Sequence, residues 1–493
     1  MKKYNLLALL LALLVTIQPV SVLAADSSES VSSTITASAE ITGEITQGTG
    51  TEPSAYGMDA DTSLASSEDL ELDGEAILLL ERNTGTMVYA KNIDEQREPA
   101  SLTKIMTCLL ALEQGNLEDQ ITVTDTALES MDPDGSSAGL LAGETYTLEQ
   151  LLYCLMVASA NDAALVIAEY IGGSQEGFVQ MMNDRASELG CTGTHFANPH
   201  GLHDEDHYST ARDLGKIMQA ALEYDIFQEL YSTASYEIPA TELQDSRIVY
   251  STNYLISTDI TSEYYDDRVV GGKTGFTTPA GRCVICTAEN DTSSYLAVVL
   301  GASATDADGN TVYSSFTTAS ELFDFGFDSF SVAMVMPEWD TVTTVPVSGG
   351  EKDATLIVPS AVNALLPLDY TQDLLTASYT LSTPELTAPL AQDSEVGTVS
   401  IYYDGTCVSQ SPLVTAAEVA SETTTSASSN TENPDSSPEA TDSGNTSTLK
   451  IIGIVVLIIL GIIALGALIL VILIIRANII RSRRRKRRQS RRR

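Results

Sequence analysis

The sequence is poor in basic residues. Its 493 residues include 26 Lys and Arg against 67 Asp and Glu, which gives a formal net charge of −41 at pH 7. A chain this acidic repels phosphate backbones, so we exclude nucleic acid as a partner and expect self-repulsion to keep the exterior soluble. The basic residues that do occur are concentrated in residues 476–493, which contain no acid.

Cysteine is also scarce, with six residues. Cys108 and Cys154 lie in apolar helical runs, which suits small buried hydrophobic side chains. Cys283 and Cys286 form a CxxC pattern within a run that reads as a strand. Residues three apart on a strand face opposite sides, so a shared metal ion or disulfide is disfavoured there. No disulfide pairing follows from the sequence.

Histidine is the third scarce residue, and all four histidines lie in one short stretch with Asp204 and Asp206: His195, His200, His203 and His207. The cluster invites a zinc interpretation, but its spacing matches no closed set of zinc ligands. We therefore assign no metal ligand and expect a structural, solvent-facing loop.

The N-terminus has the pattern of an export signal. Lys2 and Lys3 precede an apolar run over residues 6–17, and small residues end the segment near Ala24. This order predicts a secretory signal peptide over residues 1–25. The apolar run is too short for a membrane span.

The C-terminus predicts a membrane anchor. Residues 451–475 are uncharged and rich in Ile, Leu and Val, and at about 1.5 Å rise per residue a helix of this length exceeds the roughly 30 Å hydrocarbon core. The Arg- and Lys-rich tail that follows marks the cytoplasmic side, so the rest of the chain lies outside a single-pass cell membrane protein. For this tail we prefer contact with anionic lipid over nucleic acid.

Hydrophobic patterns divide the exterior part into domains. Residues 76–81 and 87–91 flank a turn and predict a β-hairpin. Further strands are expected at 282–288 and 295–301, with helical patterns between them at 101–114, 147–170, 176–189 and 214–223 and a helix end at 321–327. Strands at both sequence ends with helices between them predict an α+β domain with one antiparallel sheet.

Residues 331–417 lose helical periodicity and contain short runs rich in Thr, Val, Pro and Gly, which predict a small all-β domain. Two segments with few large apolar residues are expected to be unstructured: 26–68 and the Ser/Thr/Asn/Pro linker 418–448. The predicted order is signal peptide 1–25, disordered segment 26–68, α+β domain 69–330, β domain 331–417, linker 418–448, transmembrane helix 449–475 and basic tail 476–493.

Ser101-Leu102-Thr103-Lys104 places a hydroxyl three residues before an amine, at the start of an apolar helical run. Positions i and i+3 share one helix face, so the lysine nitrogen can reach the serine oxygen. A lysine with a lowered pKa can remove the serine proton and activate the nucleophile without histidine. Burial and a second ammonium nearby, such as that of Lys273, would both lower that pKa.

Two further motifs follow in order: Ser159-Ala160-Asn161 and Lys273-Thr274-Gly275. Ser-x-x-Lys, Ser-x-Asn and Lys-Thr-Gly together are the signature of penicillin-recognising acyl-serine enzymes. The segments 99–107, 159–173 and 271–277, with a loop over 198–213, resemble the low-molecular-mass penicillin-binding proteins, specifically the D-alanyl-D-alanine carboxypeptidases. The resemblance runs from about residue 72 to residue 327.

The resemblance implies a penicillin-binding/β-lactamase-like α+β fold and no cofactor. The substrate would be a peptidoglycan stem peptide ending in D-Ala-D-Ala, with β-lactams as covalent inhibitors. The resemblance implies that Ser101 is the nucleophile, Lys104 the general base and Ser159 the proton relay. Asn161 would orient the substrate or Lys104, Lys273 and Thr274 would bind the substrate carboxylate, and Gly275 would leave room for the substrate backbone beside its strand. The backbone N–H groups of Ser101 and Phe276 would form the oxyanion hole.

Alternatives remain at this stage. A D,D-transpeptidase or endopeptidase would use the same acylation with another acceptor, and the motifs do not separate these activities. A sensor that binds wall fragments or β-lactams would need a signalling domain, and the basic tail is too short for one. A class A β-lactamase is disfavoured because no Glu-x-x-Leu-Asn element lies between Asn161 and Lys273.

Overall fold

The structure is a computed structural model that describes residues 39, 41, 45–48, 57–60, 62–65, 70–133 and 135–422. The predicted signal peptide, nearly all of the linker, the predicted transmembrane helix and the basic tail lie outside these residues. Within the part that is described, every helix is too short or too polar to cross a bilayer.

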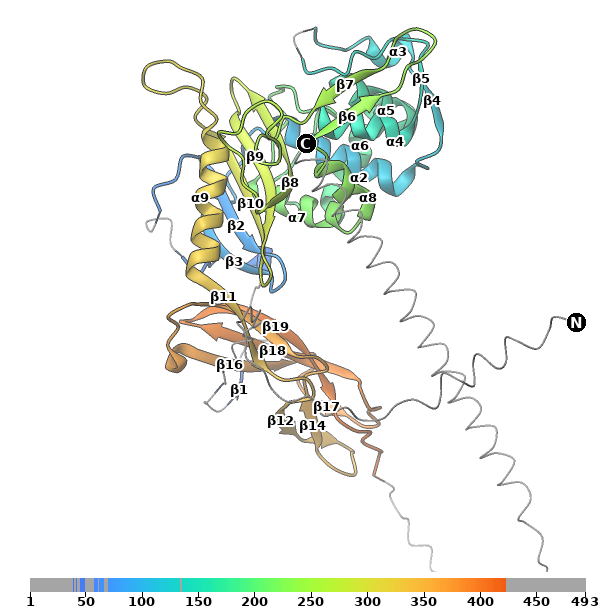
Figure 1. Cartoon of the computed structure of the whole chain (residues 1–493). Coiled ribbons are helices and arrows are strands. Elements are labelled where there is room, and N and C mark those ends of the chain that lie inside the picture. Colours follow the sequence, from blue (N-terminus) through green and yellow to red (C-terminus); the bar gives the residue numbers. More distant parts are fainter. Residues whose placement is uncertain are drawn as a thin grey trace, which may run out of the picture. The chain divides into compact units, whose positions relative to one another are not determined.

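A five-stranded antiparallel sheet forms the centre of the first domain (Figure 1). Its strand order is β3-β2-β10-β9-β8, with bounds β2 Ala76–Glu81, β3 Thr86–Lys91, β8 Val269–Thr277, β9 Gly281–Glu289 and β10 Ser294–Ala302. Strands from the beginning and the end of the domain therefore meet in one sheet. The predicted α+β architecture is confirmed.

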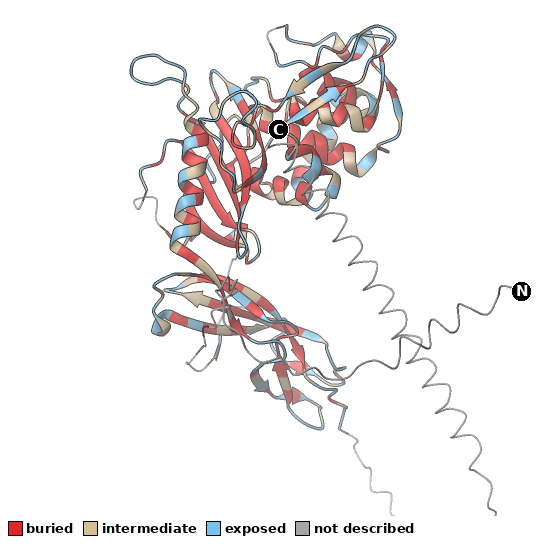
Figure 2. Ribbon diagram, in the orientation of Figure 1, coloured by how far each residue is buried: buried red, intermediate tan, exposed pale blue. Residues whose placement is uncertain are grey.

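Both faces of this sheet are covered, and Figure 2 shows the buried strands between the helices. Every residue of β2 is buried. Alternate β2 side chains belong to two different cores: Leu78 and Leu80 pack on the larger helical layer, whereas Ile77 and Leu79 pack with Phe323 of helix α9, Ser314–Ser329. A strand buried on both faces reads as a continuous apolar run, which is what residues 76–80 are.

The larger layer contains the helices between β3 and β8. They are α2 Lys104–Gln114, α3 Asp125–Leu128, α4 Leu148–Val157, α5 Asn161–Gly172, α6 Gln175–Glu188, α7 Ala211–Leu222 and α8 Asp225–Tyr231. Two small antiparallel strand pairs lie beside them: β4 Gln120–Thr122 with β5 Thr145–Thr147, and β6 Ser235–Ile238 with β7 Arg247–Tyr250.

The pattern predicted as one helix over 147–170 is two helices. α4 ends at Val157, and α5 begins at Asn161. Between them Ser159 has φ 55°, in the left-handed region that L-residues rarely adopt. Ser159 and the extended Ala160 after it break the helical path, although the apolar periodicity continues on both sides of them.

The second domain is all-β, as predicted. Its main sheet has the order β1-β16-β18-β19-β14-β12, with bounds β1 Thr46–Gln47, β12 Thr341–Val345, β14 Ala354–Ile357, β16 Leu375–Leu381, β18 Glu395–Tyr403 and β19 Thr406–Thr415. Two short pairs complete it: β11 Phe330–Met336 with β15 Val362–Pro367, and β13 Val347–Ser348 with β17 Leu386–Thr387. It has its own buried core.

The segment predicted to be disordered, 26–68, differs from that prediction where the structure describes it. Thr46 and Gln47 form β1, which pairs in parallel with β16. Ala39 and Met58 are buried, and Ala65 pairs with Tyr89. Because neighbouring domains supply both backbone partners and apolar surface, a segment of low hydrophobicity gains order that its composition alone does not provide.

Candidate active site

Ser101 and Lys104 lie on the turn that begins α2. Residues Ala100–Thr103 form a 3₁₀ turn, and the α-helix continues from Lys104. Because side chains at i and i+3 are eclipsed in a 3₁₀ turn, the two groups face each other. Lys104 Nζ lies 2.9 Å from Ser101 Oγ. The contact predicted from the Ser-x-x-Lys spacing is therefore present.

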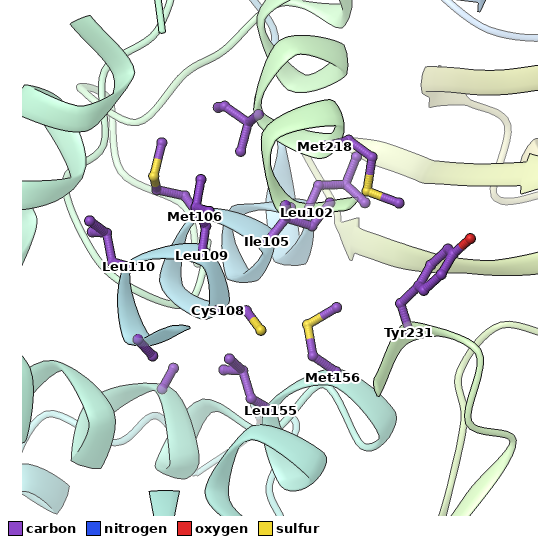
Figure 3. Packing of buried hydrophobic residues seen from close by; sticks show 14 of the residues in the cluster. Leu102, Ile105, Met106, Cys108, Leu109, Leu110, Leu155, Met156, Met218 and Tyr231 are labelled. Carbon is purple, nitrogen blue, oxygen red and sulfur yellow. The ribbon is translucent and has the colours of Figure 1, made fainter. Parts of the chain in front are cut away.

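Helix α2 holds this turn rigidly because apolar side chains surround it. Figure 3 shows Leu102, Ile105 and Cys108 packed among Met156 of α4 and Met218 of α7. All five side chains are at most 4 % exposed. A helix with no solvent-facing side in its first two turns has little freedom to move its N-terminal residues.

Lys104 has the environment of an uncharged amine. The side chain is fully buried, and burial, followed by the nearby Lys273 ammonium, lowers its pKa well below the usual range, while Asp162 opposes this shift. Lys104 Nζ donates to the carbonyl oxygen of His200 at 2.7 Å. Because burial disfavours its charged form, an amine at this distance can give up its proton and then accept the one on Ser101 Oγ, which is what a general base requires.

Ser159 and Lys273 form a second hydroxyl–amine pair. Lys273 Nζ donates to Ser159 Oγ at 2.8 Å and to the carbonyl oxygen of Thr274 at 2.9 Å. Burial lowers the pKa of Lys273 to about 7. Since the serine oxygen accepts from Lys273, its own proton is free to be donated into the cleft.

These residues surround a cleft of about 330 Å³. Strand β8, which is at the edge of the sheet, forms one wall. A β-carbon on Gly275 would lie 3.0 Å from the backbone nitrogen of Ser101, so only glycine lets the strand approach the nucleophile this closely. The lining includes Ser101, Ser136, Ser159, Asn161, Thr252, Tyr254, Thr274, Gly275, Phe276, Arg282, Tyr313 and Phe316.

Two family models match the chain. The model described as D-alanyl-D-alanine carboxypeptidase matches residues 62–304, and the model described as penicillin-binding protein 5, C-terminal domain, matches residues 333–421. The chain is 31 % identical over 353 residues to the D-alanyl-D-alanine carboxypeptidase DacF of Bacillus subtilis, covering 70 % of this chain and 86 % of that protein. The chain belongs to the D-alanyl-D-alanine carboxypeptidase family.

Other relatives agree with this assignment. DacC of Escherichia coli is 31 % identical over 370 residues, which are 72 % of this chain and 87 % of that protein. The crystal structure of penicillin binding protein 5 from Haemophilus influenzae superposes with a TM-score of 0.59 at 26 % identity, covering 71 % of this chain and 98 % of that chain. The similarity extends over both domains of this serine hydrolase.

The structure brings all the predicted site residues of this carboxypeptidase family member into one place. Ser101, Ser159, Asn161, Thr274, Gly275 and Phe276 line the cleft, and Lys104 and Lys273 lie behind the two serines. Ser159 does not cap the following helix, because the N-cap of α5 is Ala160 and it has no side-chain cap.

The histidine loop is only partly solvent-facing, which corrects the prediction. His195 and His203 are exposed, but His200 is 7 % and His207 2 % exposed. His207 Nδ1 accepts from the backbone N–H of Ala197 at 3.0 Å, and its Nε2 lies 2.8 Å from Thr103 Oγ1. Burial lowers its pKa to about 4, so His207 is neutral. The loop thereby supports the turn that carries Ser101.

Sequence reasoning missed three contributors to the site. The carbonyl oxygen of His200, which accepts from Lys104 Nζ, is a backbone group, so no residue type in the sequence indicates its role. Thr252 Oγ1 lies 2.6 Å from Thr274 Oγ1, from a loop without any motif. Arg282 lines the cleft from β9, and only its strand register opposite Phe276 could have revealed it.

The CxxC prediction is confirmed in its geometry. Cys283 belongs to the core on the helical side of the sheet, and Cys286 to the core on the α9 side. All six cysteines are free and buried. The pattern is therefore a consequence of strand alternation and joins no disulfide.

Proposed function

We propose that this enzyme removes the terminal D-alanine from peptidoglycan stem peptides ending in D-Ala-D-Ala, with Ser101 as the acylated residue. The observation that carries the proposal is the 2.9 Å contact between Ser101 Oγ and the buried Lys104 amine at the wall of the cleft. The family membership supports the substrate class and the covalent inhibition by β-lactams.

In the acylation step, Ser101 Oγ attacks the carbonyl carbon of the penultimate D-alanine, and neutral Lys104 accepts the hydroxyl proton. The developing oxyanion is placed between the backbone N–H groups of Ser101 and Phe276. Each such donor is worth about 3 kcal/mol of transition-state stabilisation. The approach of Gly275 to Ser101 N supports this placement, because it brings β8 to the same carbonyl.

Cleavage of the tetrahedral intermediate requires a proton on the leaving nitrogen. Ser159 donates its hydroxyl proton to that nitrogen, and the Lys273 ammonium replaces it through the 2.8 Å contact. Asn161 orients the substrate amide from the start of α5. D-Alanine leaves with its new N–H bond, and the penultimate residue stays on Ser101 as an ester.

Deacylation returns the enzyme to its starting state. The proton that Lys104 gained in acylation first passes to Lys273, which restores a neutral Lys104 and a charged Lys273. Water then attacks the ester carbonyl, Lys104 accepts the proton of the water, and it returns that proton to Ser101 Oγ as the C–O bond breaks. The products are D-alanine and the shortened peptide. An amine in place of water would make the same acyl-enzyme a transpeptidase.

The test uses the full-length chain and its Ser101→Ala variant, each incubated with a fluorescent penicillin and with a peptide ending in D-Ala-D-Ala. We expect stable labelling and D-alanine release by the wild type, and neither by the variant. Labelling without D-alanine release would identify a sensor or transferase, and an unlabelled wild type would overturn the proposal.

The proposed location is the outer face of the cell membrane, with a cleaved signal peptide and an anchor at residues 449–475. The uncharged run 451–475 and the basic residues after it support this topology. Fractionation of cells that express the full chain, beside a chain ending at residue 448, tests it. Full-length protein in the soluble fraction would contradict the anchor.

A further inference from the structure

Asp162, the second residue of α5, is a carboxylate that is only 2 % exposed. Each of its oxygens accepts two hydrogen bonds from neutral donors. On Oδ1 these are the backbone N–H groups of Ala138 at 3.1 Å and Ala163 at 2.9 Å, and on Oδ2 the N–H of Leu140 at 3.0 Å and the hydroxyl of Ser137 at 2.6 Å. A buried carboxylate is costly unless its oxygens are occupied, and these four donors occupy them.

Three of the four donors belong to the segment 135–140, which contributes to the lining of the cleft through Gly135 and Ser136. The carbonyl oxygen of Ser136 accepts from the backbone N–H of Asn161 at 2.8 Å. A β-carbon on Gly135 would lie 2.5 Å from Asn161 Nδ2, so the segment packs directly against that amide. The orientation of Asn161 therefore depends on where this segment lies.

The segment needs side-chain partners because residues 136–140 belong to no helix or strand. Their backbone groups have no ladder of their own to satisfy them. Arg247 of β7 donates from Nε to the carbonyl oxygen of Ala138 at 2.8 Å. Asp162 accepts the N–H groups of Ala138 and Leu140. The segment is thus fastened to α5 by one side chain and to β7 by another.

An amide could not take the place of the Asp162 carboxylate. Asparagine has the same shape but carries one oxygen and one NH₂ group, and the NH₂ group only donates. Whichever way the amide were turned, its NH₂ would face two of the four donors. Hydrogen bonds to a charged acceptor are also stronger than those to a neutral one. The contacts at this position therefore require a carboxylate.

Asp162 also acts on the general base. Burial and then the Lys273 ammonium lower the pKa of Lys104, and the negative charge of Asp162 opposes that shift. His200 and His207 face Lys104 as well, but burial lowers their pKa values to about 3 and about 4, so both are neutral at neutral pH. Lys273 and Asp162 are therefore the charged groups that adjust the basicity of Lys104.

We propose that Asp162 is a positioning residue for acylation: it fixes residues 136–140 against α5 and thereby holds Asn161 and the Ser136 side of the cleft in place. The inference rests on the proposed D,D-carboxypeptidase function and extends it with a residue that is not part of the cleft lining. Asp162 acts through Asn161, which orients the scissile amide. A displacement of about 1 Å in such a group can cost about a hundredfold in rate.

The experiment uses full-length wild type, Asp162→Asn, Ser137→Ala and Glu81→Gln. Glu81 is the matched control, because it is also buried, lies at the β2–β3 turn and accepts four hydrogen bonds from neutral donors outside the cleft lining: Asn83 Nδ2, Thr84 N–H, the Thr84 hydroxyl and Ser294 N–H. For each enzyme, kcat/KM for D-alanine release from a peptide ending in D-Ala-D-Ala and the rate of penicillin labelling are measured over a pH series. Thermal midpoints report folding.

Asp162→Asn should lower kcat/KM by at least about twentyfold. It should also move the acidic limb of the labelling profile to lower pH, because loss of the negative charge lowers the pKa of Lys104. Ser137→Ala removes one donor without changing the charge, so kcat/KM should fall about fivefold with the limb unmoved. Glu81→Gln should lower the thermal midpoint and leave both the kcat/KM and the limb as in the wild type.

A folded Asp162→Asn enzyme with the kcat/KM and the acidic limb of the wild type would overturn the assignment. If Asp162→Asn did not fold, Ser137→Ala would decide, and a wild-type kcat/KM in that variant would overturn it equally. A wild type that neither binds penicillin covalently nor releases D-alanine would instead overturn the proposed function.

Discussion

Gly201 packs directly against the carbonyl group of Ala100, the residue before the nucleophile. A β-carbon on Gly201 would lie 1.8 Å from Ala100 O, and Gly201 has φ +86°. Ala100 itself has φ 47°, which is unusual for a residue with a β-carbon. The loop that supplies the His200 carbonyl to Lys104 therefore fits the Ser101 turn at backbone distance.

Gly201→Ala should separate these two backbones and abolish the orientation of Lys104. We expect acylation by a fluorescent penicillin to fall by at least about a hundredfold and the thermal midpoint to drop. Gly309→Ala is the matched control, since Gly309 has φ +83° with nothing within 4 Å of the added carbon. Equal effects in the two variants would attribute the change to backbone strain alone.

Lys104→Ala should leave a folded protein whose acylation rate is lower by at least about a hundredfold, because Ser101 loses its base. The measurement is the rate of penicillin labelling beside the thermal midpoint. Lys216→Ala, which removes a lysine paired with Asp59 on the surface, serves as the control. Near-normal acylation by the Lys104 variant would remove this lysine from the mechanism.

Ser159→Ala and Ser159→Gly should both lose the proton relay, with D-alanine release at least about tenfold slower than in the wild type. Their stabilities should differ. The position has φ 55°, so glycine fits it without the steric cost of roughly 1–2 kcal/mol that a β-carbon carries there. Thermal unfolding of the two variants measures this difference. If alanine were the more stable of the two, Ser159 would not be strained.

Acid should destabilise the fold through the buried histidines. Burial lowers the pKa of His207 to about 4 and that of His200 to about 3, from 6.5 when exposed. Between these values the unfolded chain binds more protons, so the free energy of unfolding falls as pH decreases from about 6.5 to 4. The loss is at most about 1.4 kcal/mol per pH unit and histidine.

Thermal midpoints of wild type and His207→Gln over pH 4–8 test this expectation. The variant should lose less stability on acidification, since only the His200 contribution remains. Glutamine can replace both ring contacts, an acceptor for Ala197 N–H and a donor to Thr103 Oγ1. Parallel pH profiles for the two proteins would show that His207 does not govern the acid response.

The sequence predicts which residues carry the chemistry of the site better than it predicts the backbone conformation that places them. Ser101 and Lys104 meet because i and i+3 spacing is local, whereas Lys273 and Thr274 were found by their motif alone, since the Gly-rich strand β8 that carries them has no apolar pattern and was not predicted. The left-handed turn at Ser159 could not be foreseen, because a polar residue within an apolar helical pattern does not indicate its backbone angle. The placement of Cys283 and Cys286 on opposite faces was predictable because successive side chains of a strand alternate between its two faces.

The sequence does not predict the long-range contacts that complete the site. The His200 carbonyl and the Thr252 hydroxyl reach the site through loops that carry no periodicity. The histidines at 200 and 207 read as solvent-facing because a polar loop gives no sign of which side chains turn inward. In each case a tertiary contact, rather than a local propensity, decides the position.

Strand β1 joins the segment before the α+β domain to the all-β sheet. Thr46 and Gln47 lie before the α+β domain in sequence, yet they pair with Ser378 and Tyr379 at the rim of the all-β sheet. A protein that begins at residue 70 would lack β1, so the edge of β16 would have unpaired backbone N–H and C=O groups. An exposed strand edge can pair with strands of other molecules, so the truncated form should self-associate whereas the longer form should not.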